Sequence, residues 1–209
     1  MMLNNAQHAM TRTVLQLNFF LFALTAFFFN PRPLQAIRNP ERSLLLSADT
    51  YKSPTTRDGD LLRGVYVADV LDLPVVQQPV DGPYYVSDRD GETTQFSLVS
   101  QYGNIGLLAH NTLSGKHFSK LAIGQEVRLD YEDGKSEYFV IKQILRFQAL
   151  EPDSVASSFR NLDRNETISA VEMFNRAYVG ERRLVLQTCI AAEGDASWGR
   201  LFVVALPKE

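Results

Sequence analysis

From residue 63 onward, the chain consists of short runs of β-branched and aromatic residues separated by turn signals. Such runs are typical of strands, and their close spacing leaves little length for helices between them. Asp133-Gly134 lies between two of the runs and predicts a β-hairpin. We therefore predict a mostly β domain, a barrel or sandwich of seven or eight strands. The predicted strands are Val65–Val70, Gln95–Val99, Ile105–Ala109, Glu126–Tyr131, Glu137–Leu145, Leu184–Thr188 and Leu201–Leu206.

One helix is expected within this β-rich region. Ser169-Ala170-Val171-Glu172 matches a capping box, in which the serine and glutamate side chains satisfy backbone N–H groups at the helix start. Met173, Phe174 and Ala177 then form a partial apolar face, and Gly180 provides a stop.

The N-terminal part of the chain has a different composition. Val14–Phe29 is apolar except for three polar residues, and basic residues but no acids occur before Glu41. A helix of this length reaches about 24 Å, which suits a signal peptide or a short membrane anchor better than a buried core helix. We predict three parts: an N-terminal apolar helix within residues 1–36, a linker over 37–62 with Pro-containing turn signals, and a folded domain over 63–209.

Composition excludes several classes of function. The formal net charge of −3 argues against a basic nucleic-acid binder. The single Cys excludes an internal disulfide framework and any multi-cysteine metal site, and only three His are present. Acidic loop residues such as Asp130 and Glu132 are interpreted as solvated, so we predict no metal and no cofactor.

The lone cysteine, Cys189, directly follows the predicted strand Leu184–Thr188. It is either an inert buried thiol, half of an intermolecular bridge, or a nucleophile held at the rim of a sheet. An ordinary thiol is only about 3% ionised at pH 7, so a catalytic cysteine needs a neighbouring cation or base.

Few residues are available to assist Cys189. His110 follows a predicted strand, whereas His117 lies in a stretch that we interpret as a polar loop. Arg200 begins the last apolar strand, where it is either an edge residue or a fixed cation beside a developing oxyanion.

The order His, Cys, Arg at strand ends in a β-rich domain resembles the sortases, the membrane-anchored cysteine transpeptidases of bacterial surfaces. The family's Leu-x-Thr-Cys signature is matched in full, and the resemblance covers roughly residues 63 to 206. The matching segments are Gly103–His110, Phe118–Leu121 with Gly124–Val127, Leu186–Cys189 and Gly199–Ala205. Two departures are Asn111, where an Arg is common in the family, and the long stretch from Leu150 to Arg182.

The resemblance implies a sortase-like β-barrel of about eight strands and a cysteine transpeptidase. Cys189, His110 and Arg200 would be catalytic and would converge in one cleft, and Thr188 would shape the substrate-binding pocket. The implied partners are a sorting-motif peptide of a surface protein and an amine acceptor. The N-terminal segment would hold the protein at the cell membrane with its catalytic domain extracytoplasmic, or would release it if cleaved.

Other functions stay open at this point. A sortase-fold cysteine hydrolase would let water resolve the acyl-enzyme. Another cysteine peptidase is a further alternative, although papain-like enzymes usually carry Cys before His in the sequence. A non-catalytic domain would bind peptides or act as a scaffold in an envelope assembly.

Overall fold

The structure is a computed structural model that describes residues 61–154 and 156–209. The predicted apolar segment, residues 1–36, and nearly all of the predicted linker, residues 37–62, lie outside these ranges. The first described strand begins at Leu62. In the described ranges, no helix has both the length and the apolar character needed to span a bilayer.

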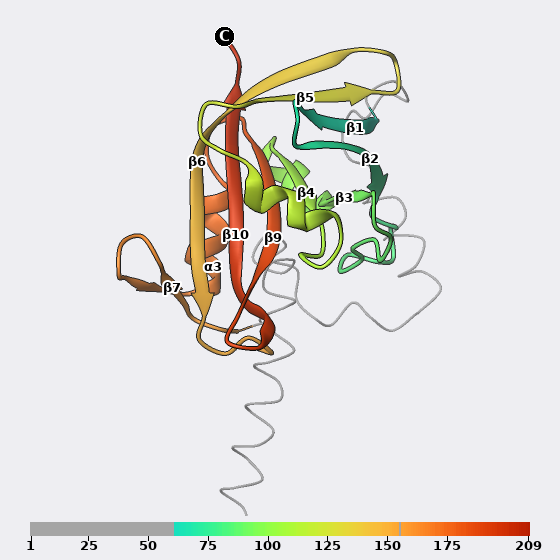
Figure 1. Cartoon of the computed structure of the whole chain (residues 1–209). Helices are drawn as coiled ribbons and strands as arrows, with labels where there is room; N and C mark the ends of the chain where they lie inside the picture. The colour runs from blue at the N-terminus through green and yellow to red at the C-terminus, as the bar shows by residue number, and fades with distance from the viewer. Residues whose placement is uncertain (1–60, 155) are drawn as a thin grey trace, which may run out of the picture.

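The described residues form a closed, mixed β-barrel, as predicted (Figure 1). Pairing runs in the order β10, β9, β4, β3, β2, β1, β5, β6, and a β6–β10 ladder closes the ring of eight strands in this part of the chain. The pairs β2–β3 and β4–β9 are parallel, and the others in the ring are antiparallel. The ring consists of β1 (Leu62–Val67), β2 (Leu71–Gln77), β3 (Thr93–Gln95), β4 (Ile105–Leu108), β5 (Glu126–Tyr131), β6 (Ser136–Ala149), β9 (Leu184–Ala192) and β10 (Asp195–Pro207).

The remaining elements are short. The hairpin β7 (Phe159–Asn161) and β8 (Thr167–Ile168) extends the sheet from β6. The helices are η3 (Ser97–Tyr102) and η4 (Ser114–Lys120), both 3-10, and α3 (Ala170–Tyr178). The predicted capping box is confirmed, since Ser169 caps α3 and bonds reciprocally with Glu172.

Several local predictions were wrong. The predicted strand Val65–Val70 ends at Val67, because Asp69 adopts a positive φ of 61° and turns the chain into β2. The predicted strand Gln95–Val99 is mostly the helix η3, whose Val99 is fully buried. The predicted polar loop around His117 is the helix η4, which turns Phe118 into the core. Each segment is too short for its periodicity to separate strand from helical turn.

Two apolar clusters lie on opposite faces of β6, β9 and β10. Leu184 and Leu186 point into the barrel, whereas Val185 between them belongs to the second cluster, on the outer face. Phe202 and Val204 of β10 face outward in the same way. The helix α3 and the β7–β8 hairpin cover this outer cluster. Burial on both faces explains why these strands have nearly continuous apolar sequences.

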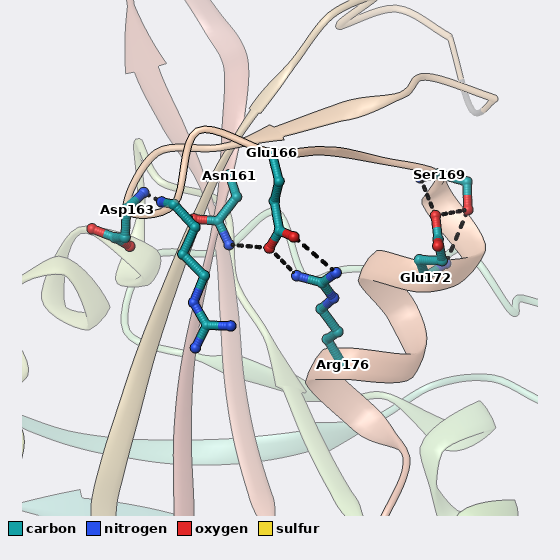
Figure 2. A network of polar contacts seen from close by, with 7 residues as sticks. Asn161, Asp163, Glu166, Ser169, Glu172 and Arg176 are labelled. Carbon is teal, nitrogen blue, oxygen red and sulfur yellow. Dashed lines mark hydrogen bonds and ion pairs between the residues drawn. The ribbon is translucent and has the colours of Figure 1, made fainter.

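Polar contacts link α3 to the β7–β8 hairpin, and together these two elements form the cover of the outer cluster (Figure 2). Glu166, which precedes β8, forms an ion pair with Arg176 of α3. Asn161 of β7 is buried and accepts backbone N–H groups from residues 163 and 164, which closes the hairpin turn. The network therefore ties α3 to the hairpin on the outer face of β6.

The Glu166–Arg176 pair makes the stability of the cover dependent on pH. The Arg176 guanidinium lowers the pKa of Glu166 below the usual value of a glutamate carboxyl group. A carboxylate with a lowered folded-state pKa stabilises the fold above its unfolded pKa, and this contribution is lost as pH falls through the folded value. We expect Glu166→Gln to lower the urea midpoint at pH 7, and the difference from wild type to shrink as pH falls below 4.5. Glu181→Gln, at an exposed glutamate, is the control and should leave the urea midpoint unchanged, both at pH 7 and below pH 4.5.

Candidate active site

Cys189 and Arg200 are direct neighbours across the β9–β10 ladder. The two strands are antiparallel, and Cys189 is the register partner of Arg200. Directly opposed residues of an antiparallel pair project to the same face, with Cβ atoms about 4.5–5.5 Å apart. Strand pairing alone therefore places the arginine beside the thiol.

Both side chains project from the outer face of the barrel. Val185, Gln187 and Cys189 alternate along β9, and Val185 belongs to the outer cluster. Arg200 alternates in the same way with Phe202 of that cluster. Cys189 is a free thiol of intermediate exposure, and Arg200 is also partly exposed. The pair lies where the apolar cover ends and solvent begins.

The residues that surround Cys189 and Arg200 on the outer face are well packed. Phe147 of β6 is the register partner of Arg200 on the other side of β10, and it is fully buried in the outer cluster. Tyr178 of α3 donates its hydroxyl to the side chain of Gln187, two residues before Cys189. Burial raises the pKa of Tyr178, so its hydroxyl stays protonated as a donor.

His110 lies just beyond β4, the strand that pairs with the other edge of β9. β4 runs parallel to β9 with Leu108 opposite Gln187, and the backbone N–H of Ala109 continues the pairing by donating to the Gln187 carbonyl (3.2 Å). His110 is the next residue, just past the end of β4. Ala109 belongs to the interior cluster, whereas His110 is exposed. The strand pairings thus set Cys189 directly beside Arg200, and they bring the end of β4, two residues before His110, alongside β9.

Thr188 holds the loop that carries His110. It is 3% exposed, and its hydroxyl donates to the Ala109 carbonyl (2.8 Å). The His110 carbonyl accepts from the N–H groups of Leu113 and Gly115, both at 3.0 Å. The residue predicted to line a substrate pocket therefore lies beneath the His110 loop, with its hydroxyl proton engaged by the backbone.

Gly115 is required at the same contact. A Cβ atom at this position would stand 2.2 Å from the Thr188 hydroxyl oxygen and 2.7 Å from the carbonyl oxygens of Ala109 and His110. Only glycine allows η4 to approach this closely. The sequence analysis missed this residue, because a Ser-Gly pair in a polar stretch is typical of an ordinary turn.

The Arg200 guanidinium rests on its own hairpin. Nη1 donates to the carbonyls of Ser197 (2.8 Å) and Gly199 (2.9 Å). Among residues 61–154 and 156–209, Nε and Nη2 of Arg200 make no hydrogen bond. Gly199 is buried, and a Cβ there would stand 2.4 Å from the Phe147 carbonyl oxygen. The glycine before Arg200 therefore lets β10 approach β6 closely at the site.

The other residues singled out in the sequence have different surroundings. His117 lies in η4, and strand register does not link it to Cys189; its Nδ1 is buried without a hydrogen-bond partner among the described residues. The indole Nε1 of Trp198, the only Trp, is likewise buried and unpartnered in that part of the chain. Over the described ranges, no group of three His, Cys, Asp or Glu side chains is placed to hold a metal ion.

The solved structures to which the chain is similar are sortases. Sortase A of Listeria monocytogenes is 12% identical, with 71% of this chain and 88% of that chain covered and a TM-score of 0.46. The lid mutant of Streptococcus agalactiae sortase C1 is 16% identical, with 70% of this chain and 68% of that chain covered and a TM-score of 0.45. Clostridium perfringens sortase C, solved with the C-terminal cell wall sorting motif, is 17% identical, covering 73% of each chain, with a TM-score of 0.43.

Neither a protein-family model nor a curated protein matches the chain. Sortases A and C both occur among the structural neighbours, so no subclass follows from them.

The Thr188 hydroxyl is open to a direct test. Thr188→Val keeps the shape of the side chain but leaves the Ala109 carbonyl without its donor, which should cost about 1–3 kcal/mol of unfolding free energy. Thr188→Ser keeps the hydroxyl and should lose less. Urea denaturation of both variants measures the difference, and a Thr188→Val protein as stable as wild type would show that the hydrogen bond contributes nothing to stability.

Proposed function

We propose that the protein is a cysteine transpeptidase of the sortase type, which cleaves a peptide through a thioester on Cys189 and transfers the acyl group to an amine. The observation that carries the proposal is the β9–β10 register that sets Cys189 directly beside Arg200. It is supported by the parallel pairing of β9 with β4, the strand that leads to His110. The Leu-x-Thr-Cys signature and the order of the three residues in the sequence support it as well.

In the first half-reaction, the Cys189 thiolate attacks the carbonyl carbon of the scissile peptide bond. A C–S bond forms, and the C–N bond then breaks. His110, in its imidazolium form, gives its proton to the leaving amine. The negative charge on the carbonyl oxygen is met by Arg200, whose Nε and Nη2 carry the hydrogen atoms not engaged by the hairpin.

In the second half-reaction, an amine attacks the thioester. His110, now neutral, accepts the proton that the amine loses, and the C–S bond breaks as the new C–N bond forms. The Cys189 thiolate and the His110 imidazolium are thereby restored. Water in place of the amine would give hydrolysis by the same steps.

The proposed substrates are a sorting-motif peptide of a surface protein and an amine acceptor in the cell envelope. Thr188 contributes to the substrate site by positioning the His110 loop at its edge. We place the catalytic domain outside the cytoplasm, with the apolar run Val14–Phe29 as its membrane signal or anchor.

Mass spectrometry tests the chemistry directly. The full chain is incubated with a pool of sorting-motif-type peptides, with and without glycinamide as the acceptor. A transpeptidase gives an acyl adduct on Cys189 and a peptidyl-glycinamide product, whereas a hydrolase gives the free acid in both mixtures. Cys189→Ala is the control and should give neither. A pool that yields no adduct and no product with wild type would remove the proposal.

The reactivity of Cys189 provides a prediction that needs no substrate. Iodoacetamide should label Cys189 in the native protein, because the thiol is partly exposed beside a cation. His110→Ala should slow the labelling or shift its pH dependence, since the ring either takes the proton or stabilises the thiolate. His117→Ala is the matched control and should leave the pH profile as in wild type. Labelling that requires denaturant would indicate an inert thiol.

Arg200→Lys should separate oxyanion stabilisation from thiol activation. A guanidinium offers a planar fork of donors, whereas an ammonium is a mobile point charge. Losing one oxyanion donor typically lowers the rate by about 100- to 1000-fold. We expect acyl transfer from a peptide identified in the pool to fall on that order, while iodoacetamide labelling of Cys189 falls much less. Acyl transfer within a few-fold of wild type would return Arg200 to a structural role.

A further inference from the structure

Two loops meet beside Cys189, and side-chain placement there depends on more than strand pairing. β4 ends at Leu108, so His110 lies in the turn that follows it. The β9–β10 ladder is irregular over residues 195–199, and carbonyls of this stretch hold the Arg200 guanidinium. The separation of the two candidate catalytic side chains is therefore set by how these loops contact each other.

One hydrogen bond joins the two loops. Asn111 Nδ2 donates to the carbonyl oxygen of Ala196 over 2.9 Å, across 85 residues of sequence. Within the described ranges, no other hydrogen bond links residues 109–113 with residues 193–199. Asn111 directly follows His110, and Ala196 directly precedes the serine whose carbonyl accepts from Arg200. The contact thus connects the backbone beside His110 with the backbone that holds the arginine.

We propose that Asn111 is a positioning residue that sets the placement of His110 and Arg200 on either side of Cys189. It acts through the two loops and touches no reacting atom. The inference rests on the proposed function, because it takes Cys189 as the nucleophile. An amide suits this role, since its N–H donors do not titrate and add no charge beside the thiol.

The electrostatic potential at Cys189 provides a readout that a loss of stability alone would not move. Iodoacetate and iodoacetamide alkylate the same thiolate, but only iodoacetate carries a negative charge. A cation held near the sulfur therefore raises the ratio of the iodoacetate rate to the iodoacetamide rate, most strongly at low ionic strength. The ratio measures how well Arg200 and protonated His110 are placed.

We expect Asn111→Ala in the full chain to lower this ratio by about fivefold, because losing one neutral hydrogen bond shifts a local equilibrium by roughly that factor. Thr112→Ala, at the exposed next residue, is the matched control and should keep the wild-type ratio. Asn111→Leu, which keeps the side-chain volume without the donors, should behave as Asn111→Ala and replaces it if that variant does not fold. A ratio equal to that of Thr112→Ala would overturn the proposal.

A double-mutant cycle with Arg200→Gln tests the route of the effect. If Asn111 acts through the hairpin that holds Arg200, Asn111→Ala lowers the ratio much less once the arginine charge is gone. Equal losses in both backgrounds would overturn the assigned route. A failure of the proposed function gives a different result from a failure of this inference. In the first case wild-type Cys189 alkylates only in denaturant, whereas ordinary alkylation with a ratio insensitive to Asn111 removes this inference alone.

Discussion

The double pairing of β10 is the constraint on which the rest of the structure depends. This strand pairs with β9 along one edge and with β6 along the other, and the β6 ladder is the contact that closes the barrel. Closure leaves the ring without a free edge and encloses the interior cluster. It also sets the register of β10 against β9, which decides that Arg200 is the β10 residue opposite Cys189.

Burial on both faces of the same strands determines where a reactive site can occur. Along β9, the residues from Leu184 to Leu186 are enclosed by the interior on one side and by the α3 cover on the other. The cover ends as the strand continues, so Cys189 becomes partly exposed while its backbone stays in a ladder. A thiol in this position is held rigidly and is still reachable from solvent. Ala177 and Tyr178 pack α3 into the outer cluster, and the Glu166–Arg176 ion pair links the helix to the β7–β8 hairpin.

The parts of the fold that were predictable from sequence are those with long or chemically specific signals. The apolar runs of β9 and β10, the Asp133-Gly134 hairpin and the capping box at Ser169 were all identified. The β1–β2 turn was missed, since it uses Ala68 and Asp69 without a glycine. The short strands β7 and β8 were also missed, because two or three residues carry no periodicity and their pairing depends on β6.

By itself, the sequence determined that the domain is mostly β and that His110, Cys189 and Arg200 are the candidate residues, because strand patterning and the rarity of Cys and His are visible in one dimension. The choice of a barrel over a sandwich came from the family resemblance and is confirmed by the β6–β10 ladder. Only the tertiary structure decided how these residues are held. Parallel pairing of β4 with β9 sets the strand that leads to His110 beside the strand that carries Cys189. The contacts of Thr188 with Ala109 and of Asn111 with Ala196 join residues 79 and 85 positions apart. Such contacts follow from strand register and loop approach, and neither is encoded in local residue patterns.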